Sequence, residues 1–307
     1  MIRFIQRLAF WTGFGALLFG CGASRLSPGE KGHALAGRVW DVGAEREISR
    51  EALFGRASAS RFVILGETHD NREHHRLQAG ILAAMLQAGR SPALVMEQFD
   101  REHQAALDAV RGRGERDPER IADAGRFDRK GWSWPDYRSL VELAIANDLP
   151  IIAANMSRVE ARAVARAGRP AAGLGPATPE LRTALERDLV EGHCGVRPAP
   201  AALAGLIEAQ RARDARMAAA LESSGERGAV LIVGAGHARR DRGAPVYLSG
   251  AARGRLLAIA FVEIEPGRNE LRAYAGEGLA ASYDFVQFTQ RAVREDPCKN
   301  LPEIPSR

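Results

Sequence analysis

Short runs of consecutive apolar residues recur along the chain, and segments with helical spacing of apolar positions separate them. Runs of four to six apolar residues without polar alternation are typical of strands buried on both faces, and helical crossovers between them indicate parallel pairing. The predicted strands are RFVILG (61–66), ALVMEQ (93–98), LPIIAAN (149–155), AVLIVGAG (229–236) and LLAIAFVEI (256–264). The pattern therefore predicts an α/β fold with a mostly parallel central sheet flanked by helices.

Three segments between these runs are strong helix candidates. HHRLQAGILAAMLQAG places Leu77 and Ile81 on one apolar face and ends at Gly89, and YRSLVELAIAND and AALAGLIEAQRARDARMAAALESS follow later. The interval 157–227 contains no convincing strand. We therefore expect a smaller all-helical subdomain at about 157–227, inserted in the α/β domain and covering part of the sheet.

The first twenty residues form a separate segment. Arg3 and Arg7 precede the apolar core LAFWTGFGALLF, which is shorter than the roughly 20 apolar residues of a membrane-spanning helix and is typical of an export signal. Residues 18–20, Leu-Phe-Gly, stand before Cys21 and resemble a bacterial lipobox, although Phe19 is bulkier than usual. We expect residues 1–20 to be a removed signal peptide and Cys21 to be lipid-modified.

Lipidation of Cys21 would anchor the mature protein to the cell envelope. Gly22 after the cysteine resembles the outer-membrane sorting signal, so the expected location is the outer membrane. Residues 21–32 would then be a membrane tether, 33–298 the α/β domain with its helical insertion, and 299–307 a C-terminal tail.

Composition is ordinary for a globular protein, with 46% hydrophobic and 26% charged residues. The formal charge of +5 is spread along the chain rather than gathered in basic blocks, which argues against nucleic-acid binding. With Cys21 lipidated, Cys194 and Cys298 are an even pair in a compartment where disulfides persist, so we predict that they are joined. Two unrelated buried thiols are the alternative.

Polar residues follow four of the predicted strands directly. Glu67 and His69 follow the first strand, Glu97 lies at the end of the second, Asn155 ends the third, and His237 follows the fourth. In open α/β sheets the crevice outside the carboxyl ends of the strands is where ligands bind. Glu67 and His69 are two residues apart, so extended backbone would point both side chains to one side.

Two imidazoles and two carboxylates suit a divalent metal such as manganese, cobalt or zinc, and Glu67, His69, Glu97 and His237 are the candidate ligands. The same groups suit acid and base roles without metal. Each of these residues could also have no role in a site, and Glu97, for example, could be a solvated residue in a strand-to-helix turn. Asp70 or Asn71 is expected to cap the next helix. His74 and His75 are adjacent, so at most one is expected to face the crevice.

A family resemblance adds to this interpretation. The motifs GETH and GAGH, with the glutamate of MEQF, resemble the superfamily of Tiki proteins, TraB proteins and erythromycin esterases. LGETHDNREHHRLQ, IIAANMSR, EGHCG, AQRARDARMA, VGAGHARRDRGAPVYL and DPC are similar, in order, to the ChaN-like haem-binding lipoproteins. The similarity runs from about residue 33 to 298.

The resemblance implies a membrane-anchored protein that binds haem for haem or iron uptake, with haem held between two subunits of a homodimer. Family members use a tyrosine as axial ligand, and Tyr137 is our candidate, although packing against Trp132 or Trp134 would also explain it. His193 beside Cys194 is a second candidate ligand, although packing beside the predicted disulfide would also explain it. The guanidinium groups of residues 239 and 240 are candidates for the propionates, although HARRDR is equally consistent with a solvated loop.

The superfamily also implies an alternative. Its Tiki-like members are metal-dependent peptidases and its esterase members use a histidine and glutamates, so Glu67, His69, Glu97 and His237 would here form a catalytic cluster of a divalent-metal-dependent hydrolase. The resemblance favours a binding protein over an enzyme. A third possibility is an anchored interaction protein with a vestigial site.

Overall fold

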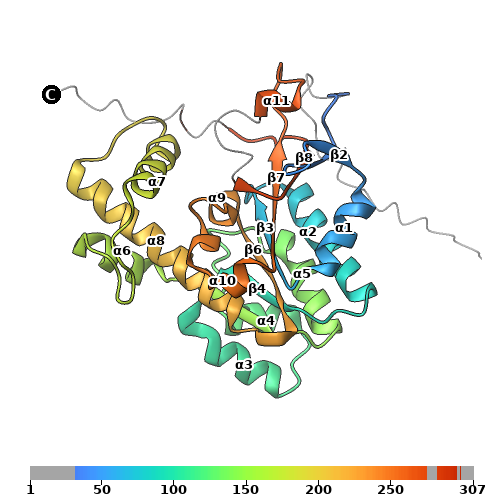
Figure 1. Cartoon of the computed structure of the whole chain (residues 1–307). Helices are drawn as coiled ribbons and strands as arrows, with labels where there is room; N and C mark the ends of the chain where they lie inside the picture. Colours follow the sequence, from blue (N-terminus) through green and yellow to red (C-terminus); the bar gives the residue numbers. More distant parts are fainter. Residues whose placement is uncertain (1–31, 275–281, 296–297, 299–307) are drawn as a thin grey trace, which may run out of the picture.

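The computed structural model describes residues 32–274, 282–295 and 298. A central sheet carries helices on both faces, and a helical lobe extends from one side (Figure 1). The strands are β1 (Val39–Asp41), β2 (Arg46–Ile48), β3 (Phe62–Glu67), β4 (Ala93–Asp100), β5 (Ile151–Asn155), β6 (Ala229–Gly234), β7 (Leu256–Glu263) and β8 (Phe285–Thr289). The α-helices are α1 (Arg50–Ala59), α2 (Arg72–Gln87), α3 (Gln104–Gly112), α4 (Pro118–Ala124), α5 (Trp134–Ala146), α6 (Arg158–Ala167), α7 (Pro179–Gly192), α8 (Pro200–Glu222), α9 (Ala235–Ala238), α10 (Gly250–Arg253) and α11 (Leu271–Tyr274). Single 3-10 turns are η1 (Arg101–His103), η2 (Gly225–Arg227) and η3 (Ala244–Tyr247).

The sheet has eight strands in the order β2-β1-β8-β7-β3-β6-β4-β5. The strands from β8 to β5 pair in parallel, whereas β1 is antiparallel to both β2 and β8. The five strands predicted from apolar runs correspond to β3, β4, β5, β6 and β7, so the α/β class is confirmed. The sequence interpretation missed β1, β2 and β8.

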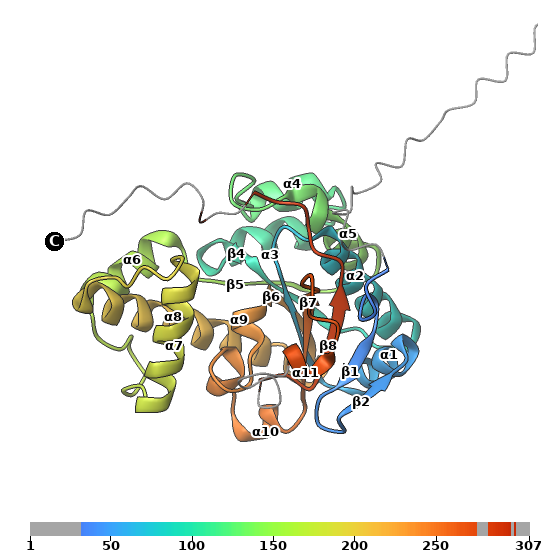
Figure 2. The ribbon, with the colours of Figure 1, turned by 90° about the horizontal axis from the view of Figure 1, so that it is seen from above.

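Alternate residues of the parallel strands enter two hydrophobic cores. On β3, Val63 and Leu65 pack with residues of α1, α2, α4 and α5 on one face of the sheet, whereas Phe62 and Ile64 pack with α8, α9 and α10 on the other. Figure 2 shows the two helical layers from above. Each fully buried aliphatic side chain contributes about 1.5–3 kcal/mol. Burial on both faces is the reason that these strands read as unbroken apolar runs.

The helical lobe consists of α6, α7 and α8, which lie between β5 and β6 in the chain with no strand among them. A capping box starts α6, because the Ser157 side chain accepts from the backbone N–H of Glu160 and the Glu160 side chain accepts from that of Ser157. α6 then packs closely on α8. A Cβ atom added at Gly205 would lie 2.0 Å from the carbonyl oxygen of Ala165, so only glycine permits this approach.

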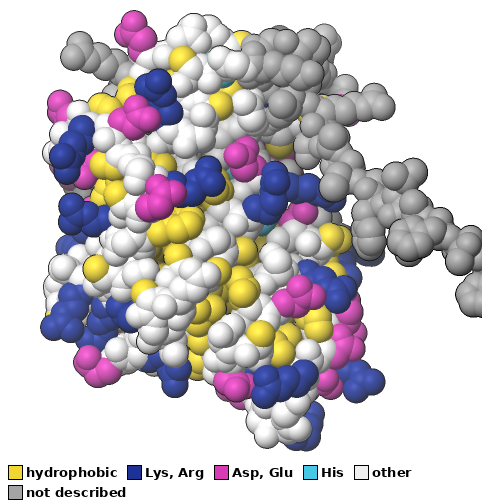
Figure 3. All heavy atoms as spheres, turned by 90° about the vertical axis from the view of Figure 1, so that its right-hand side faces the viewer, with side chains coloured by type: hydrophobic (Ala, Val, Ile, Leu, Met, Phe, Trp, Pro, Cys, Tyr) yellow, Lys and Arg dark blue, Asp and Glu magenta, His cyan; other side chains and the backbone are white. Residues whose placement is uncertain are grey.

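A disulfide joins Cys194, just after α7, to Cys298 near the C-terminus, with 5.6 Å between the Cα atoms. The sequence prediction of this pairing is confirmed. The signal peptide, the lipidation site Cys21 and the tail 299–307 lie outside the described residues. No helix in the described ranges is both long and apolar enough to cross a membrane. On the face seen in Figure 3, basic and acidic side chains are interspersed around a stretch of hydrophobic ones.

Candidate functional site

The candidate residues lie at the carboxyl edge of the parallel sheet. β6 lies between β3 and β4, and Glu67 at the end of β3 pairs with Gly234 at the end of β6. α9 begins directly after Gly234 and carries His237. Glu97 is in β4, on the other side of β6. The prediction that polar groups from separate strands meet at this edge is therefore correct in geometry. We call this set, Glu67, His69, Glu97 and His237, the strand-end cluster.

Glu67 is buried, with 2% of its surface exposed, and is surrounded by donors. Its Oε1 atom lies 2.9 Å from Nδ1 of His69 and accepts from the hydroxyl of Tyr137, and its Oε2 atom accepts from Nε2 of Gln78 at 2.6 Å. Burial disfavours the carboxylate, but hydrogen bonds from His69 and His75 outweigh burial and lower the pKa of Glu67 to about 2. Glu67 is therefore a fixed negative charge beneath His69.

His69 is the exposed member of the cluster, since 46% of its side chain is accessible. Its ring meets Trp132 edge to face, with the ring centroids 4.6 Å apart. Burial lowers the pKa of His69, whereas the hydrogen bond to Glu67 and the charge of Glu97 raise it, with a net increase. This imidazole is the group that a molecule entering from solvent would meet first.

Glu97 and His237 form the buried half of the cluster. One carboxylate oxygen of Glu97 accepts from the backbone N–H of Gly234 at 2.9 Å, and the other lies 3.5 Å from Nε2 of His237. Nδ1 of His237 lies 2.6 Å from Oδ1 of Asp214 on α8. Burial lowers the pKa of His237, but the charges of Asp214 and Glu97 outweigh it and raise the pKa to about 9. His237 is therefore an imidazolium at neutral pH.

Gly234 connects the two halves of the cluster. A Cβ atom at this position would lie 2.8 Å from Cε1 and 2.9 Å from Nε2 of His69, and 3.8 Å from Oε2 of Glu97. The His69 ring therefore occupies the space that any side chain at 234 would fill. At Gly236, by contrast, nothing lies within 4 Å of the Cβ position.

His74 and His75 are both buried in the first turn of α2, and they face different sides, with His75 turned toward Glu67 and His74 toward Thr289 of β8. Nδ1 of His74 accepts from the backbone N–H of Thr68, and Nε2 lies 2.8 Å from Oγ1 of Thr289. His75 lies 3.2 Å from Glu67. His75 therefore contacts the cluster directly through Glu67, whereas His74 holds the loop between β3 and α2 through Thr68. Asn71 is the cap, since it accepts from the backbone N–H of Glu73.

The strand-end cluster does not have metal-site spacing in this conformation. Within the described residues, one group of three acidic or histidine side chains has ligand atoms that all lie within 4.8 Å of one another. It consists of Asp100, Glu102 and His103, at the end of β4 and in η1. Glu67 already accepts hydrogen bonds from several donors, and each ring nitrogen of His237 already lies beside a carboxylate. A divalent metal at the strand-end cluster therefore stays a prediction from the sequence.

A family model described as "Haem-binding uptake, Tiki superfamily, ChaN" matches residues 53–248, which include the whole strand-end cluster. The chain belongs to this family. No curated protein matches the sequence.

Solved structures agree with ChaN membership at the level of fold. The structure is similar to ChaN of Campylobacter jejuni, which binds haem cofacially, with a TM-score of 0.68 and 22% identity over 81% of this chain and 95% of that chain. Weaker similarities are to the type III effector HopBA1 (TM-score 0.46, 16% identity, 84% and 98% covered) and to RRSP, a MARTX toxin effector domain from Vibrio vulnificus (TM-score 0.41, 14% identity, 81% and 40% covered). The similarity to the Campylobacter protein confirms the fold.

Tyr137, the candidate haem ligand, is fully buried in α5. Its hydroxyl donates to Glu67, and its ring meets Trp132 with 5.9 Å between the centroids. Burial and the charge of Glu67 raise the pKa of the phenol, which disfavours the phenolate that would bind iron. In this conformation Tyr137 fits the packing interpretation, and haem iron cannot reach its oxygen.

The other three tyrosines differ in how accessible their hydroxyl groups are to haem iron. The hydroxyl of Tyr283 donates to the carbonyl of Ala235, and that of Tyr274 accepts from the backbone N–H of Glu265. Both residues are 7% exposed. Tyr247 is half-buried, and its hydroxyl accepts from Nε of Arg211 at 3.3 Å. Among the four tyrosines, Tyr247 is the most accessible.

His193 fits a ligand role well. It is exposed immediately after α7, and its Nδ1 atom lies 2.6 Å from the carbonyl oxygen of Leu189. A carbonyl can only accept, so Nδ1 must carry a proton, and in the neutral ring Nε2 then carries the lone pair. No described group contacts Nε2 in a hydrogen bond. The ring therefore presents an available ligand atom in a fixed tautomer.

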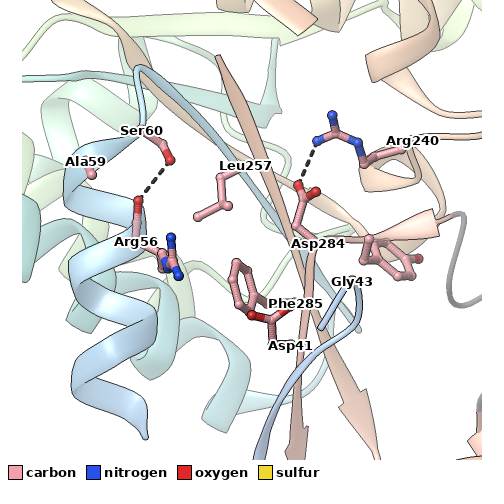
Figure 4. Close-up of a pocket in the computed structure, with 10 residues that line it drawn as sticks. Asp41, Gly43, Arg56, Ala59, Ser60, Arg240, Leu257, Asp284 and Phe285 are labelled. Atoms are coloured by element: carbon pink, nitrogen blue, oxygen red, sulfur yellow. Dashed lines mark hydrogen bonds and ion pairs between the residues drawn. The ribbon is translucent and has the colours of Figure 1, made fainter. Parts of the chain in front are cut away.

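Arg239 and Arg240, the propionate candidates, are already paired with carboxylates. Arg239 makes a two-point contact with Asp241 at 3.0 Å, and Arg240 donates to Asp284 at 2.7 Å. Arg240 lines a cavity of about 520 Å³ at the amino ends of β7 and β8, the edge of the sheet opposite the strand-end cluster. Figure 4 shows its guanidinium turned toward Asp284, above Leu257 and Phe285. The structure therefore does not bring the four haem candidates into one site.

Sequence reasoning missed the residues that support the cluster. Asp214 and Gln210 on α8 both contact His237, and Gln78 and Gln98 both donate to Glu67. One signal was available: Gln210 and Asp214 are four residues apart in AQRARDARMA, so they share a helix face. Nothing in the sequence says that this face meets α9.

Proposed function

We propose that this protein is a lipid-anchored haem-binding protein of the bacterial cell envelope that acts in haem or iron uptake. Membership of the ChaN family supports the haem ligand. The export signal and the lipobox-like residues before Cys21 support anchoring, with the outer membrane as the proposed location. Haem itself supplies the iron coordination chemistry, and the protein supplies an axial ligand and a surface.

His193 is the proposed axial ligand, and its geometry carries the proposal. Its Nδ1–H is held by the carbonyl of Leu189, and Nε2 is available on an exposed ring. The adjacent disulfide at Cys194 fixes the chain at this point. An imidazole on the surface of the helical lobe leaves the opposite side of a bound haem uncovered. A second copy of the chain would cover it, which is why we propose a homodimer around haem.

The test is a titration of the intact protein in detergent with haemin, followed by the Soret band. We expect binding at micromolar haemin, a weakening of at least tenfold in His193→Ala, and dimer formation that depends on haemin. His69→Ala is the matched control, because it removes another exposed imidazole from a different site. Tyr247→Phe is the second comparison. Loss of the Soret shift in Tyr247→Phe but not in His193→Ala would transfer the ligand role to Tyr247 and reject our assignment.

Lipid anchoring at Cys21 and the outer-membrane location are tested by a separate experiment. Cells that express the chain are fed a radiolabelled fatty acid, and the envelope is separated by density. Label should follow the wild-type protein into the outer-membrane fraction and be absent from Cys21→Ser. A protein that carries no label, or that stays in the inner membrane, would contradict the proposed location.

A second function is favoured by the strand-end cluster. His237 lies between two buried carboxylates while exposed His69 lies over buried Glu67, an arrangement that pairs a proton donor with a group able to activate water. We therefore propose hydrolysis of an ester or peptide as the second candidate, with Glu67, His69, Glu97 and His237 as the catalytic residues. Haem on the helical lobe and hydrolysis at the sheet edge use different residues, so one does not exclude the other.

Hydrolysis is tested with p-nitrophenyl butyrate and a fluorogenic peptide library, with and without added manganese, cobalt or zinc. Activity that is lost in both His69→Ala and His237→Ala would support the second function. If metal is required, elemental analysis should find it in the wild type and not in these variants. A chain that neither hydrolyses these probes nor binds haemin would leave the anchored interaction protein as the remaining interpretation.

A further inference from the structure

α8 presents a carboxylate to the Nδ1 side of His237. Asp214 is 1% exposed, and its Oδ1 atom lies 2.6 Å from Nδ1 of His237. Gln210, one turn earlier on α8, places Nε2 3.2 Å from the same nitrogen. The remaining ring nitrogen, Nε2, lies 3.5 Å from Oε1 of Glu97. The ring is therefore held between α8 and β4 with its two nitrogens in different surroundings.

The contact with Asp214 determines which nitrogen faces the strand-end cluster. An ionised carboxylate can only accept, so Nδ1 must carry a hydrogen in this bond. A ring turned over by 180° would move Nδ1 away from Asp214 and leave a buried carboxylate without its donor, which costs about 1–3 kcal/mol or more. Nε2 is consequently the nitrogen that faces Glu97.

Other charged or titratable groups also face His237 and were compared with Asp214. Arg213 on α8 acts on His237 through its charge, Glu97 approaches from β4, and His69 approaches from the loop after β3. Arg213 cannot accept a hydrogen, and Glu97 lies on the Nε2 side. Only Asp214 among these groups accepts from Nδ1.

We propose that Asp214 is a positioning residue that holds the Nδ1–H of His237 and so fixes the ring orientation, with Nε2 directed toward Glu97 and the rest of the strand-end cluster. This inference rests on the hydrolytic function proposed above for the strand-end cluster. Asp214 would not touch the substrate, because the imidazole ring lies between its carboxylate and Glu97. In serine hydrolases, the amide variant of such an aspartate leaves the geometry intact and lowers kcat about 10⁴-fold, because the tautomer is wrong.

Asp188 offers a matched control. It lies on α7 and makes a two-point contact with Arg242 at 2.6 and 2.8 Å, in the loop that follows α9. Asp188→Asn therefore weakens an equally short carboxylate contact between the helical lobe and the segment directly after α9, without touching His237. If Asp214 serves only to hold α8 against α9, Asp188→Asn and Asp214→Asn should behave alike.

The experiment combines nitrogen NMR and kinetics on the intact protein in detergent, labelled with ¹⁵N-histidine. The wild-type spectrum should show His237 with a proton on Nδ1. In Asp214→Asn the side-chain amide can donate to Nδ1, so the proton should leave that nitrogen. The kcat for p-nitrophenyl butyrate should fall at least 100-fold, with KM changed less than about threefold. Asp188→Asn should keep both the Nδ1 signal and kcat within about threefold of wild type.

The outcomes separate the positioning role from the proposed hydrolysis. A wild-type Nδ1 without a proton, or an unchanged His237 signal in Asp214→Asn, overturns the positioning role even if this variant is inactive. Equal losses of kcat in Asp214→Asn and Asp188→Asn would likewise overturn it, since both would then act through folding. A wild-type protein that shows the predicted nitrogen signals but does not hydrolyse the ester rejects hydrolysis while the positioning of His237 stands.

Discussion

Removal of the disulfide between Cys194 and Cys298 should destabilise the protein by several kcal/mol. The two cysteines are 104 residues apart, so the bond closes a long loop in the unfolded chain. In the chain-entropy model, a loop of about 100 residues contributes about 4.7 kcal/mol to the free energy of unfolding. Cys194 is half-buried and Cys298 is exposed, so a serine at either position buries no new polar group of consequence. We expect the double variant Cys194→Ser/Cys298→Ser to lose about 3–5 kcal/mol.

Urea and thermal denaturation of the wild type and the double variant measure this loss. The melting temperature should fall by on the order of 10 °C, given about 2–4 °C for each kcal/mol in a chain of this size. Dithiothreitol provides the internal control, because it should lower the stability of the wild type to that of the variant and leave the variant unchanged. A double variant within about 0.5 kcal/mol of wild type would refute the loop-entropy reasoning. It would indicate that the unfolded chain already keeps these segments together.

Four further predictions concern α1, the helical lobe and the strand-end cluster. Gly205→Ala should destabilise by about 1–3 kcal/mol in urea denaturation, because a Cβ there overlaps a backbone carbonyl. Gly55→Ala in α1, where nothing lies within 4 Å, should stabilise by about 0.5–1 kcal/mol, and the opposite sign for either variant would contradict the packing argument. Glu67→Gln should cost about 3 kcal/mol at pH 7, because the pKa of Glu67 is lowered from 4.5 to about 2. This contribution is complete above pH 4.5 and disappears as the pH falls through 2, so the melting temperatures of the wild type and Glu67→Gln should converge in acid. A difference in melting temperature that does not change with pH would contradict this assignment. Gly234→Ala should displace His69 and lower ester hydrolysis about 100-fold while haemin affinity is unchanged, whereas full activity would show that the ring is free to move.

Only the part of the candidate site that lies at the ends of strands could be predicted from the sequence. Glu67 and Glu97 each stand at the end of an unbroken apolar run, and parallel strands bring their carboxyl ends to one edge. The haem candidates lacked such a signal. Tyr137 is one of four tyrosines, and whether its hydroxyl faces solvent or Glu67 depends on how α5 packs against β3. The sequence marks His193 only as the neighbour of Cys194. The structure shows that Nε2 is its available nitrogen, because the backbone carbonyl of Leu189 holds Nδ1.

The sequence by itself determined the parallel core, the disulfide partners and the edge where polar groups gather. These features follow from local signals: strands buried on both faces require apolar residues at every position, and the two cysteines that remain when Cys21 is set aside have a single pairing. The strand order, the antiparallel edge of β1, β2 and β8, and the placement of α8 against α9 were decided only by the tertiary structure. Asp214 illustrates the physical reason. Its contact with His237 joins residues 23 positions apart through the packing of two helices, and such a contact depends on the shapes of both elements rather than on the residues near either one.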